Sequence, residues 1–326
     1  MDASTPSGSA GRVLVIVLNF NGLADTLGCL ESLRRQTCGC FDVLLIDNGS
    51  RADDLGAVAA RFPRTEVIAL PENLGWAGGN NVGLRLARAR GYGWACLLNN
   101  DTVLEPEAMA ELLAAAAAVG VPCLLHPAIF YYDAPSRPQL YPDLAATADP
   151  ASRRLSAEHD IVEMNWAYGA CLLLPAAMFA PEEQGGVGLL DERFFLQLEE
   201  QDYYHRAAAL GLRSYCGRRA RIMHKESASF GSCMPATRCM PATKIYYLAR
   251  NSLLLAEKHD ATPAGFLRSL RRLLWLLRIS VPADRTTLSR LGLLRWLLSS
   301  DASAQAARAG LGDYVRRRFG PRPMPK

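Results

Sequence analysis

Residues 95–106, ACLLNNDTVLEP, place two amides and a carboxylate at the end of an apolar run. Asn99, Asn100 and Asp101 follow residues typical of a buried strand, and Pro106 indicates a loop into the next element. Hard divalent cations prefer oxygen ligands, and Mg²⁺ usually takes only one or two carboxylates when substrate phosphates supply the others. The segment therefore predicts a cation site in which Asp101 is the carboxylate ligand.

His224, in RIMHKESAS, is a candidate for a further metal ligand. A lone histidine is more often structural, and that alternative stays open. As a ligand, an imidazole suits Mn²⁺ better than Mg²⁺. The expected cofactor is a divalent metal ion, Mg²⁺ or Mn²⁺.

Three carboxylates, Glu199, Glu200 and Asp202, lie close together in FFLQLEEQDYYHRA. Acidic residues favour the start of a helix because of the helix dipole alone. The functional alternative is a general base, with one carboxylate directed at an acceptor hydroxyl.

Two more motifs suit a nucleotide. Asp47 ends an apolar run and could accept hydrogen bonds from a base or a ribose, although DNGS is also typical of a turn. Gly78 and Gly79, in ENLGWAGGNNVG, predict a helix that opens on a glycine pair, where backbone amides can bind phosphate. An ordinary loop-to-helix junction with asparagine capping is the alternative.

Alternating strands and helices would position these groups. We expect strands in 12–22, 41–50, 66–73 and 94–101, and helices in 23–37, 52–62, 78–91 and 106–120. This alternation predicts a parallel sheet covered on both faces, with ligands at the carboxyl ends of its strands. The polar clusters at 19–21, 47–50, 73–81 and 99–101 all fall at that edge.

The second half of the chain is less regular. We expect a loop or lid at 131–160, a strand, turn and strand within 162–179, and a helix within 190–210. The sequence CMPAT is duplicated at 233–237 and 239–243, and we interpret it as a loop without a functional account. Residues 1–11 are small and polar and predict a disordered leader.

Charge and cysteine content limit the class of protein. The chain has a net charge of +4, but the part from Asn251 onward has 14 basic and five acidic residues. Nine cysteines occur without a CxxC pair, and Cys38 and Cys40 are too close to bridge comfortably, so we expect buried or free thiols. We see no secretory signal and no uncharged apolar run long enough to span a membrane. We expect a cytoplasmic protein.

The basic C-terminal part contains an amphipathic segment, GFLRSLRRLLWLLRIS. Its apolar face comprises Phe266, Leu270, Leu273, Leu274 and Leu277, and its arginines lie largely opposite. This pattern fits a helix on an anionic membrane surface, peripheral on the cytoplasmic face of the inner membrane, or a helix packed on the domain. We expect no nucleic-acid partner, because the arginines accompany leucines rather than base-stacking aromatic residues.

Taken together, these motifs resemble bacterial family 2 glycosyltransferases of the rhamnosyltransferase-like branch. The resemblance is carried, in order, by VIVLNFNG, LLIDNGS, ENLGWAGGNNVGLRLA, LLNNDTVLEP, WAYGACLLLP, DERFFLQLEEQDYYHRA, MHKESAS and YYLARNSLLLAEK. It implies an α/β GT-A fold, with a mixed, mostly parallel sheet covered by helices, and a C-terminal helical extension. It implies a glycosyltransferase domain at 12–258, with a nucleotide-sugar half at 12–125 and an acceptor and catalytic half at 126–258, followed by a basic amphipathic region at 259–326.

The resemblance also implies roles for individual residues. The implied donor-binding set is Asn19, Asn21, Asp47, Asn73, Gly78, Gly79, Asn80, Asn99 and Asn100. The implied acceptor-side set is Trp166, Gly169 and Ala170; the metal ligands are Asp101 and His224; the base is Glu200, with Glu199 and Asp202 as alternatives. The implied partners are a dTDP- or UDP-sugar and a glycan, lipid-linked or small-molecule acceptor, with inversion at the anomeric carbon.

Two positions depart from the family pattern. Asn99 stands where the family's DxD motif has its first acid, which leaves less negative charge for a cation. Glu200 stands where the family usually has an aspartate. A degenerate binding or scaffold protein therefore remains an alternative, and a sugar-phosphate nucleotidyltransferase is a weaker one, because NFNGLADT lacks the Gly-rich basic loop that such enzymes need.

Overall fold

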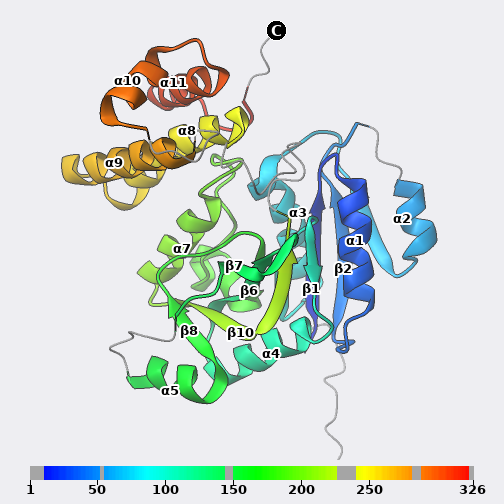
Figure 1. The fold of residues 1–326 in the computed structure, drawn as a ribbon. Helices are drawn as coiled ribbons and strands as arrows, with labels where there is room; N and C mark the ends of the chain where they lie inside the picture. Colours follow the sequence, from blue (N-terminus) through cyan, green and yellow to red (C-terminus); the bar gives the residue numbers. More distant parts are fainter. Residues whose placement is uncertain (1–10, 52–54, 144–149, 226–239, 281–287, 323–326) are drawn as a thin grey trace, which may run out of the picture. The chain divides into compact units, whose positions relative to one another are not determined.

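The structure is a computed structural model that describes residues 11–51, 55–143, 150–225, 240–280 and 288–322 (Figure 1). The chain divides into two compact units. The first, named the sheet unit, comprises Met1–Asn73, Gly78–Leu190 and Tyr203–Gly231. The second, named the helical unit, comprises Leu74–Ala77, Asp191–Asp202 and Ser232–Lys326. The predicted leader (apart from Gly11) and most of the CMPAT duplication lie outside the described residues.

Within the described ranges, the sheet unit contains a ten-stranded mixed sheet in the order β3-β2-β1-β4-β9-β6-β10-β5, with β7 paired to β6 and β8 to β10. The strands are β1 Val13–Asn19, β2 Phe41–Asp47, β3 Thr65–Ala69, β4 Trp94–Asn99, β5 Thr102–Leu104, β6 Cys123–Tyr131, β7 Ala134–Leu140, β8 Ile161–Met164, β9 Cys171–Pro175 and β10 Arg213–His224. Parallel pairs β3-β2-β1-β4 and β6-β10 account for most of the paired residues. The predicted sheet class is confirmed.

The helices between these strands are α1 Leu23–Arg34, α2 Leu55–Arg61, α3 Gly75–Ala89, α4 Ala108–Val119, α5 Pro150–His159, α6 Ala176–Phe179 and α7 Glu199–Ala209, with a short 3₁₀ helix at Glu182–Gln184. Helices α3 and α7 each contain residues of both units. After a strand, the next helix begins beyond the point where the buried apolar residues of that strand give way to polar residues, as the sequence predicts.

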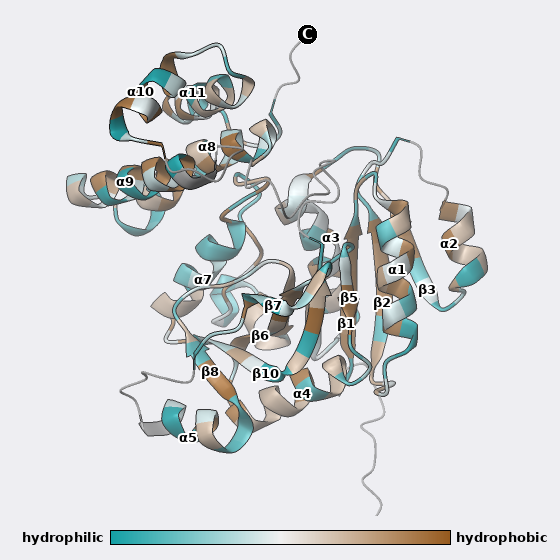
Figure 2. Ribbon diagram, in the orientation of Figure 1, coloured by the Kyte–Doolittle hydropathy of each residue, from teal (hydrophilic) through white to brown (hydrophobic). Residues whose placement is uncertain are grey.

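Helices cover both faces of the sheet. Side chains along β1 alternate, so Val15 and Val17 belong to a core shared with α1, α2 and α4. On the other face, Gly83 of α3 approaches Ile16 so closely that an added Cβ would lie 2.7 Å from that side chain. Figure 2 shows these central strands as the hydrophobic part of the sheet unit. The two covered faces explain why the strands are continuous apolar runs.

Helix α3 begins earlier than predicted. The sequence suggested that it opens on Gly78 and Gly79, but it starts at Gly75, so both glycines lie inside it. A Cβ at Gly79 would lie 2.5 Å from the Leu18 side chain. The absent side chain at Gly79 therefore allows close packing of α3 on β1.

The helical unit contains α8 Ala242–His259, α9 Pro263–Ser280, α10 Arg290–Leu298 and α11 Ala302–Val315. Side chains cap the last two helices: Ser289 accepts a hydrogen bond from the Gly292 amide, and Asp301 accepts from the Ser303 and Ala304 amides. The four helices enclose a small core. No helix in the described ranges is long and apolar enough to cross a bilayer.

The apolar face predicted for α9 is used inside this unit. Leu273 and Leu277 are 1% and 2% exposed, and Leu270 and Leu274 pack against the same core. Of the two predicted alternatives, membrane binding or packing on the protein, the structure therefore shows this face packed on the protein. Any lipid-facing surface of the helical unit must be made of other side chains.

Two expectations were wrong. Residues 131–160 are not a loop, because β7 pairs with β6 and α5 follows; β7 is an exposed edge strand with two prolines, so it lacks the alternation that identifies strands. Cys38 and Cys40 form a disulfide, with Cα atoms 5.6 Å apart, a separation within the range that disulfides need. The free cysteines are buried as expected: Cys29, Cys96, Cys123, Cys171 and Cys216.

Candidate functional site

Parallel pairing brings the ends of β1, β2 and β4 to one edge of the sheet. Asn19 is the register partner of Asp47, and Leu18 is that of Asn99. Asn19 is fully buried and Asp47 is 5% exposed, and Asn19 Nδ2 donates to Asp47 Oδ1 over 2.8 Å. The structure therefore brings together polar groups that the sequence placed at this edge.

A second set of contacts fixes Asn19 from its other side. Its Oδ1 accepts from Thr26 Oγ1 at 2.9 Å and from Asn100 Nδ2 at 3.2 Å. Asn100 Nδ2 also donates to Thr26 Oγ1 at 3.0 Å and to the Gly22 carbonyl at 3.2 Å. Thr26 is fully buried and was missed by the sequence analysis; its only signal was a polar residue on the inward face of α1. Asn19 and Asn100 thus have one defined orientation each.

The turn after β2 is tied to the turn after β1. Ser50 donates to the Asp47 carboxylate through Oγ at 2.5 Å and through its amide at 3.2 Å. The Asn21 amide donates to Ser50 Oγ at 2.7 Å, and Asn21 Oδ1 accepts from the Arg51 amide at 3.0 Å. Asn21 is left-handed, with φ 52°, a conformation that asparagine tolerates. These contacts hold Asp47 in place; its role with a nucleotide stays a prediction.

Asn73 joins the same edge from the end of the β3 loop. Asn48 Nδ2 donates to Asn73 Oδ1 over 3.0 Å. Between Asn48 and Ser50, Gly49 has φ 74°, and an added Cβ would lie 2.5 Å from the Glu72 carbonyl carbon. Only glycine permits this approach of the two loops.

Two asparagines inside α3 have different roles. Asn80, a predicted donor-binding residue, is 1% exposed. Asn81, which the sequence analysis did not propose as a site residue, donates through Nδ2 to the Leu190 carbonyl at 2.9 Å and accepts from the Leu190 amide at 3.0 Å. Asn81 therefore anchors a backbone segment 109 positions away and is structural.

The two predicted metal ligands face each other. Asp101 Oδ1 lies 3.2 Å from His224 Nε2, and both side chains are 7% exposed. Antiparallel pairing of β5 with β10 sets this contact, since Thr102 is the register partner of His224. The Asp101 carbonyl also accepts from the Lys225 amide at 3.0 Å.

Gln139 of β7 determines which nitrogen of His224 carries a proton. Gln139 Nε2 donates to the His224 carbonyl at 3.0 Å, so Gln139 Oε1 faces the ring, 2.8 Å from Nδ1. An amide oxygen only accepts hydrogen bonds, so Nδ1 must donate. Tyr168 donates to the same Oε1 at 3.2 Å. A neutral His224 therefore presents an unprotonated Nε2 to Asp101.

This arrangement fits a divalent cation. A carboxylate oxygen and a ring lone pair 3.2 Å apart repel each other unless a proton or a metal ion lies with them. An oxygen and an imidazole nitrogen suit Mn²⁺ better than Mg²⁺. The described residues contain no group of three or more His, Cys, Asp or Glu side chains that could hold a metal, so the protein would supply two ligands and leave positions open.

The predicted acceptor-side segment lies beside this pair. The Asn99 amide donates to the Ala170 carbonyl at 3.0 Å, and Ser214 Oγ donates to the Trp166 carbonyl at 2.9 Å. Tyr168 meets the His224 ring edge-on, with centroids 6.4 Å apart. The loop between β8 and β9, which includes Gly169, is thereby fixed to the carboxyl end of β4.

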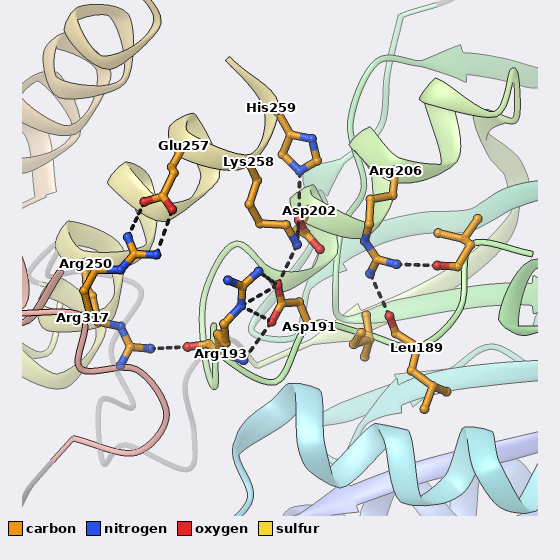
Figure 3. A network of polar contacts seen from close by, with 12 residues as sticks. Leu189, Asp191, Arg193, Asp202, Arg206, Arg250, Glu257, Lys258, His259 and Arg317 are labelled. Carbon is orange, nitrogen blue, oxygen red and sulfur yellow. Dashed lines mark hydrogen bonds and ion pairs between the residues drawn. The ribbon is translucent and has the colours of Figure 1, made fainter. Parts of the chain in front are cut away.

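The three predicted base candidates belong to the helical unit, and Asp202 is neutralised there. It is fully buried and lies 2.5 Å from Lys258 Nζ and 2.8 Å from His259 Nε2 (Figure 3). Lys258 also bonds Asp191 over 2.6 Å. Burial opposes ionisation of Asp191, yet its hydrogen bonds to Arg193 and Lys258 hold its pKa well below the usual range. Asp202 and Asp191 are thus parts of a structural ion-pair network.

Glu199 and Glu200 have no such cations. Glu199 is 3% exposed, and its Oε2 has no hydrogen-bond partner among the described residues. Burial, and then the neighbouring Glu200 charge, raises the pKa of Glu199 well above its ordinary value. Burial also raises the pKa of Glu200, to about 7. Glu200 can therefore exchange a proton near neutral pH.

Residues 14–157 match the model of the family described as Glycosyl transferase family 2. The chain is also 28% identical to N-acetylglucosaminyl-diphospho-decaprenol L-rhamnosyltransferase of Mycobacterium tuberculosis over 276 residues, which are 77% of this chain and 84% of that protein. The predicted resemblance to family 2 glycosyltransferases of the rhamnosyltransferase-like branch is confirmed.

A shorter stretch of the chain has a higher identity to other relatives. It is 47% identical over 75 residues to an uncharacterized protein of Mycobacterium tuberculosis, and this covers 22% of the chain and 25% of the relative. The chain thus spans about a quarter of the length of the first relatives it matches.

Solved glycosyltransferase structures share the fold. S. aureus TarS matches with a TM-score of 0.56 and 15% identity, over 94% of this chain and 49% of that chain. TarS 1–349 in complex with UDP matches with a TM-score of 0.52 and 15% identity, over 94% and 92%. GalNAc-T7 with UDP, GalNAc and Mn²⁺ matches with a TM-score of 0.53 and 13% identity, over 82% and 56%. The predicted GT-A fold is confirmed.

Proposed function

We propose that this glycosyltransferase moves a sugar from a nucleotide-diphosphate donor to a hydroxyl of an acceptor, with inversion at the anomeric carbon. One observation carries the proposal: the Asp101 carboxylate faces the His224 lone pair at the sheet edge where α/β proteins bind ligands. The family match supports the reaction class, because the matched residues 14–157 contain Asp101 and the ends of β1, β2 and β4.

Asp101 and His224 would hold a divalent cation. When bound, the metal ion would stabilise the negative charge that grows on the departing diphosphate. Asn99 replaces a carboxylate in this position, so the protein provides one negative charge rather than two. GalNAc-T7, which shares the fold, was crystallised with Mn²⁺, and the imidazole ligand here favours the same ion.

Glu200 would take the proton of the acceptor hydroxyl. A base works best when its pKa lies near the working pH, and burial raises the pKa of Glu200 to about 7. Asp202 is a poor candidate because Lys258 and His259 already neutralise it. Glu199 is the poorer base, because burial and the Glu200 charge raise its pKa well above the ordinary value.

The proposed donor and acceptor are inferred from proteins that are similar to this chain. Related structures contain UDP and UDP-GlcNAc, and the mycobacterial relative is named as a rhamnosyltransferase that acts on a diphospho-decaprenol lipid. We propose a dTDP- or UDP-sugar donor, with rhamnose as the first candidate sugar, and a lipid-linked glycan acceptor. Asn19, Asn21, Asp47, Asn73 and the α3 residues Gly78, Gly79 and Asn80 would surround the donor, with Trp166, Gly169 and Ala170 on the acceptor side.

Slow donor hydrolysis tests the proposal without knowledge of the acceptor. Purified protein with Mn²⁺ should release nucleoside diphosphate from at least one nucleotide sugar of a panel. Glu200→Gln should lower turnover about 10²–10⁴-fold and still bind nucleotide, because it removes only the base. Glu183→Gln, at an exposed position, is the matched control. A panel without any release would favour the degenerate binding protein instead.

Metal dependence has its own test. Asp101→Ala should weaken donor binding in calorimetry with Mn²⁺ and leave metal-free binding unchanged. Equal binding by both proteins in Mn²⁺ would remove Asp101 from the metal site.

We also propose that the helical unit meets an anionic membrane surface. The face is on α10, where Leu291, Leu294 and Leu298 are 58%, 53% and 75% exposed at helical spacing, with Arg290 and Arg295 beside them. Residues 261–280 and 288–300 contain six arginines and no acidic side chain. Apolar and basic residues on one helix suit an interfacial position that would reach a lipid-linked acceptor.

Vesicle flotation tests this surface. The protein should float with vesicles that contain anionic lipid, less so at high salt, and not with neutral vesicles. Leu294→Ser with Leu298→Ser should abolish flotation, whereas Val121→Ser, 60% exposed in the sheet unit, should not. Equal flotation of both variants would contradict the assignment to α10.

A further inference from the structure

The backbone just before the acidic pair is unusual. Phe195, Gln197 and Leu198 have φ values of 63°, 71° and 72°. Residues with a Cβ rarely adopt this left-handed conformation, and it persists only where surrounding groups hold it. Three such residues lie directly before α7, whose first residue is Glu199. Something must therefore hold this segment, residues 193–198.

Asn251 of α8 holds the segment from one side. It is fully buried, and its Nδ2 donates to three carbonyls of the segment. The acceptors are Phe194 at 2.9 Å, Leu196 at 2.8 Å and Gln197 at 2.7 Å. One side-chain amide thus bonds the carbonyls around the left-handed residues.

Arg250 is also fully buried; it orients Asn251 and makes further hydrogen bonds to the segment (Figure 3). Arg250 Nε donates to Asn251 Oδ1 at 2.9 Å, which directs Nδ2 of that amide toward the segment. Arg250 Nη2 donates to the Arg193 and Phe194 carbonyls at 2.9 and 2.7 Å, and Nη1 to the Gly320 carbonyl at 2.7 Å. Burying a guanidinium to bond carbonyls is expensive, so these contacts must matter to the fold or to the reaction.

A second set of contacts fixes Phe195 itself. Its carbonyl accepts from the Trp76 amide at 2.7 Å, and its ring stacks on Tyr247 with centroids 5.2 Å apart. An added Cβ at Gly75 would lie 2.3 Å from the Phe195 carbonyl oxygen. The segment is therefore held by helix α8 and by residues 74–77.

We propose that Arg250 and Asn251 are positioning residues for sugar transfer, because they hold the left-handed segment that presents Glu200 to the acceptor. The proposal depends on the proposed role of Glu200 as the base. It assigns a part in the reaction to α8, which carries no candidate base or metal ligand. The Arg250 cation has a second effect: it opposes the rise that burial causes in the pKa of Glu199.

Kinetics of conservative variants test the proposal. Asn251→Asp keeps the size and the acceptor for Arg250 but loses the donating Nδ2. We expect its kcat to fall about 10²-fold with the donor KM unchanged, because a base misplaced by about 1 Å costs that much. Ser252→Ala is the matched control, since Ser252 lies next on α8 and its hydroxyl donates to the Leu248 carbonyl of the same helix. Ser252→Ala should keep the wild-type kcat.

Hydrogen exchange gives a readout that does not depend on catalysis. Amides of residues 194–199 and of Trp76 should exchange faster in Asn251→Asp than in wild type, and Ser252→Ala should match wild type. Should Asn251→Asp fail to fold, Arg250→Lys takes its place, because it keeps the cation and loses the fork of donors.

Slower kcat together with faster exchange supports the proposal. Wild-type exchange in the folded variant overturns it, whatever Glu200→Gln shows. Faster exchange with wild-type kcat overturns it too, because the segment would then be structural only. Full turnover by Glu200→Gln would instead refute the proposed base, so the two failures are distinguishable.

Discussion

The edge of the sheet and the first turn of α7 both bury carboxylates, but they treat them differently. At the sheet edge, Asp47 meets amides and hydroxyls, and Asp101 meets an imidazole. In the helical unit, Asp202 bonds the Lys258 ammonium and the His259 ring, whereas the buried Glu199 has no ion pair of this kind and its Oε2 has no hydrogen-bond partner among the described residues. The difference separates three uses of a carboxylate: to orient neighbours, to bind a cation, and to exchange a proton.

The charged groups beside a carboxylate decide its use more than its burial does. Asp202 is the most buried of the three acids at the start of α7, yet its cations make it a structural residue. Glu200 is partly exposed, but burial still raises its pKa to about 7 because no cation compensates. A carboxylate in a sequence motif therefore becomes a base candidate only when its neighbours leave it uncompensated.

Replacing Asp202 should test this contrast most strongly. Asp202→Asn removes the carboxylate that bonds His259 and one of the two that bond Lys258 in the described ranges, so we expect the free energy of unfolding to fall by about 2–3 kcal/mol. Glu257→Gln is the control, because Glu257 and Arg317 form an exposed pair worth under about 1 kcal/mol. Urea unfolding measures both. Equal losses in the two variants would show that the Asp202 network is no more than a surface ion pair.

Replacing Gln139 should disturb the sheet edge alone. Gln139→Leu no longer directs the His224 proton to Nδ1, so we expect Mn²⁺ affinity to fall about 10–100-fold. Titration of Mn²⁺ followed by electron paramagnetic resonance measures this directly. Tyr168→Phe removes a different bond to the same Oε1 and should have a smaller effect. Unchanged Mn²⁺ affinity in Gln139→Leu would contradict the proposed ligand pair.

The pH dependence of stability should single out Glu200. Its pKa rises from an ordinary 4.5 to about 7 in the folded state, so the native protein holds a proton that the unfolded chain has lost. The contribution of Glu200 to stability is therefore full below about pH 4.5 and is lost as pH rises to about 7. Glu200→Gln should exceed wild type in unfolding free energy by about 1–2 kcal/mol at pH 8 and equal it near pH 4. Urea unfolding at both pH values decides; a loss of stability at pH 8 would mean that Glu200 is compensated after all.

Local signals explain why the sheet edge could be predicted. Apolar runs that end in polar residues mark the carboxyl ends of β1, β2 and β4, and parallel pairing then places Asn19, Asp47 and Asn99 together. The resemblance to family 2 also placed Asp101 and His224 as a pair, and the structure brings them within 3.2 Å.

Long-range contacts explain what could not be predicted. Gln139 reaches His224 across 85 positions, from a strand whose prolines suggested a loop. Asn251 reaches the segment before α7 across 54 to 57 positions. Neither residue has a local signal, because an isolated amide in a strand or a helix is typical of solvent-exposed positions. The apolar face of α9 could be recognised, but its amphipathic pattern is the same for a membrane and for a protein core.

The last contrast concerns two glycines in helices on opposite faces of β1. Gly83→Ala should lower the unfolding free energy by about 1–2 kcal/mol, because its Cβ would lie 2.7 Å from Ile16 and push α3 off the sheet edge. Gly28→Ala, in α1, meets nothing within 4 Å and should raise it by about 0.5–1 kcal/mol through helix propensity. Thermal unfolding of the two variants measures both signs. If Gly83→Ala were also stabilising, α3 would have room to shift, and the asparagines that it carries to the donor edge would not be held as tightly as those on β1 and β4.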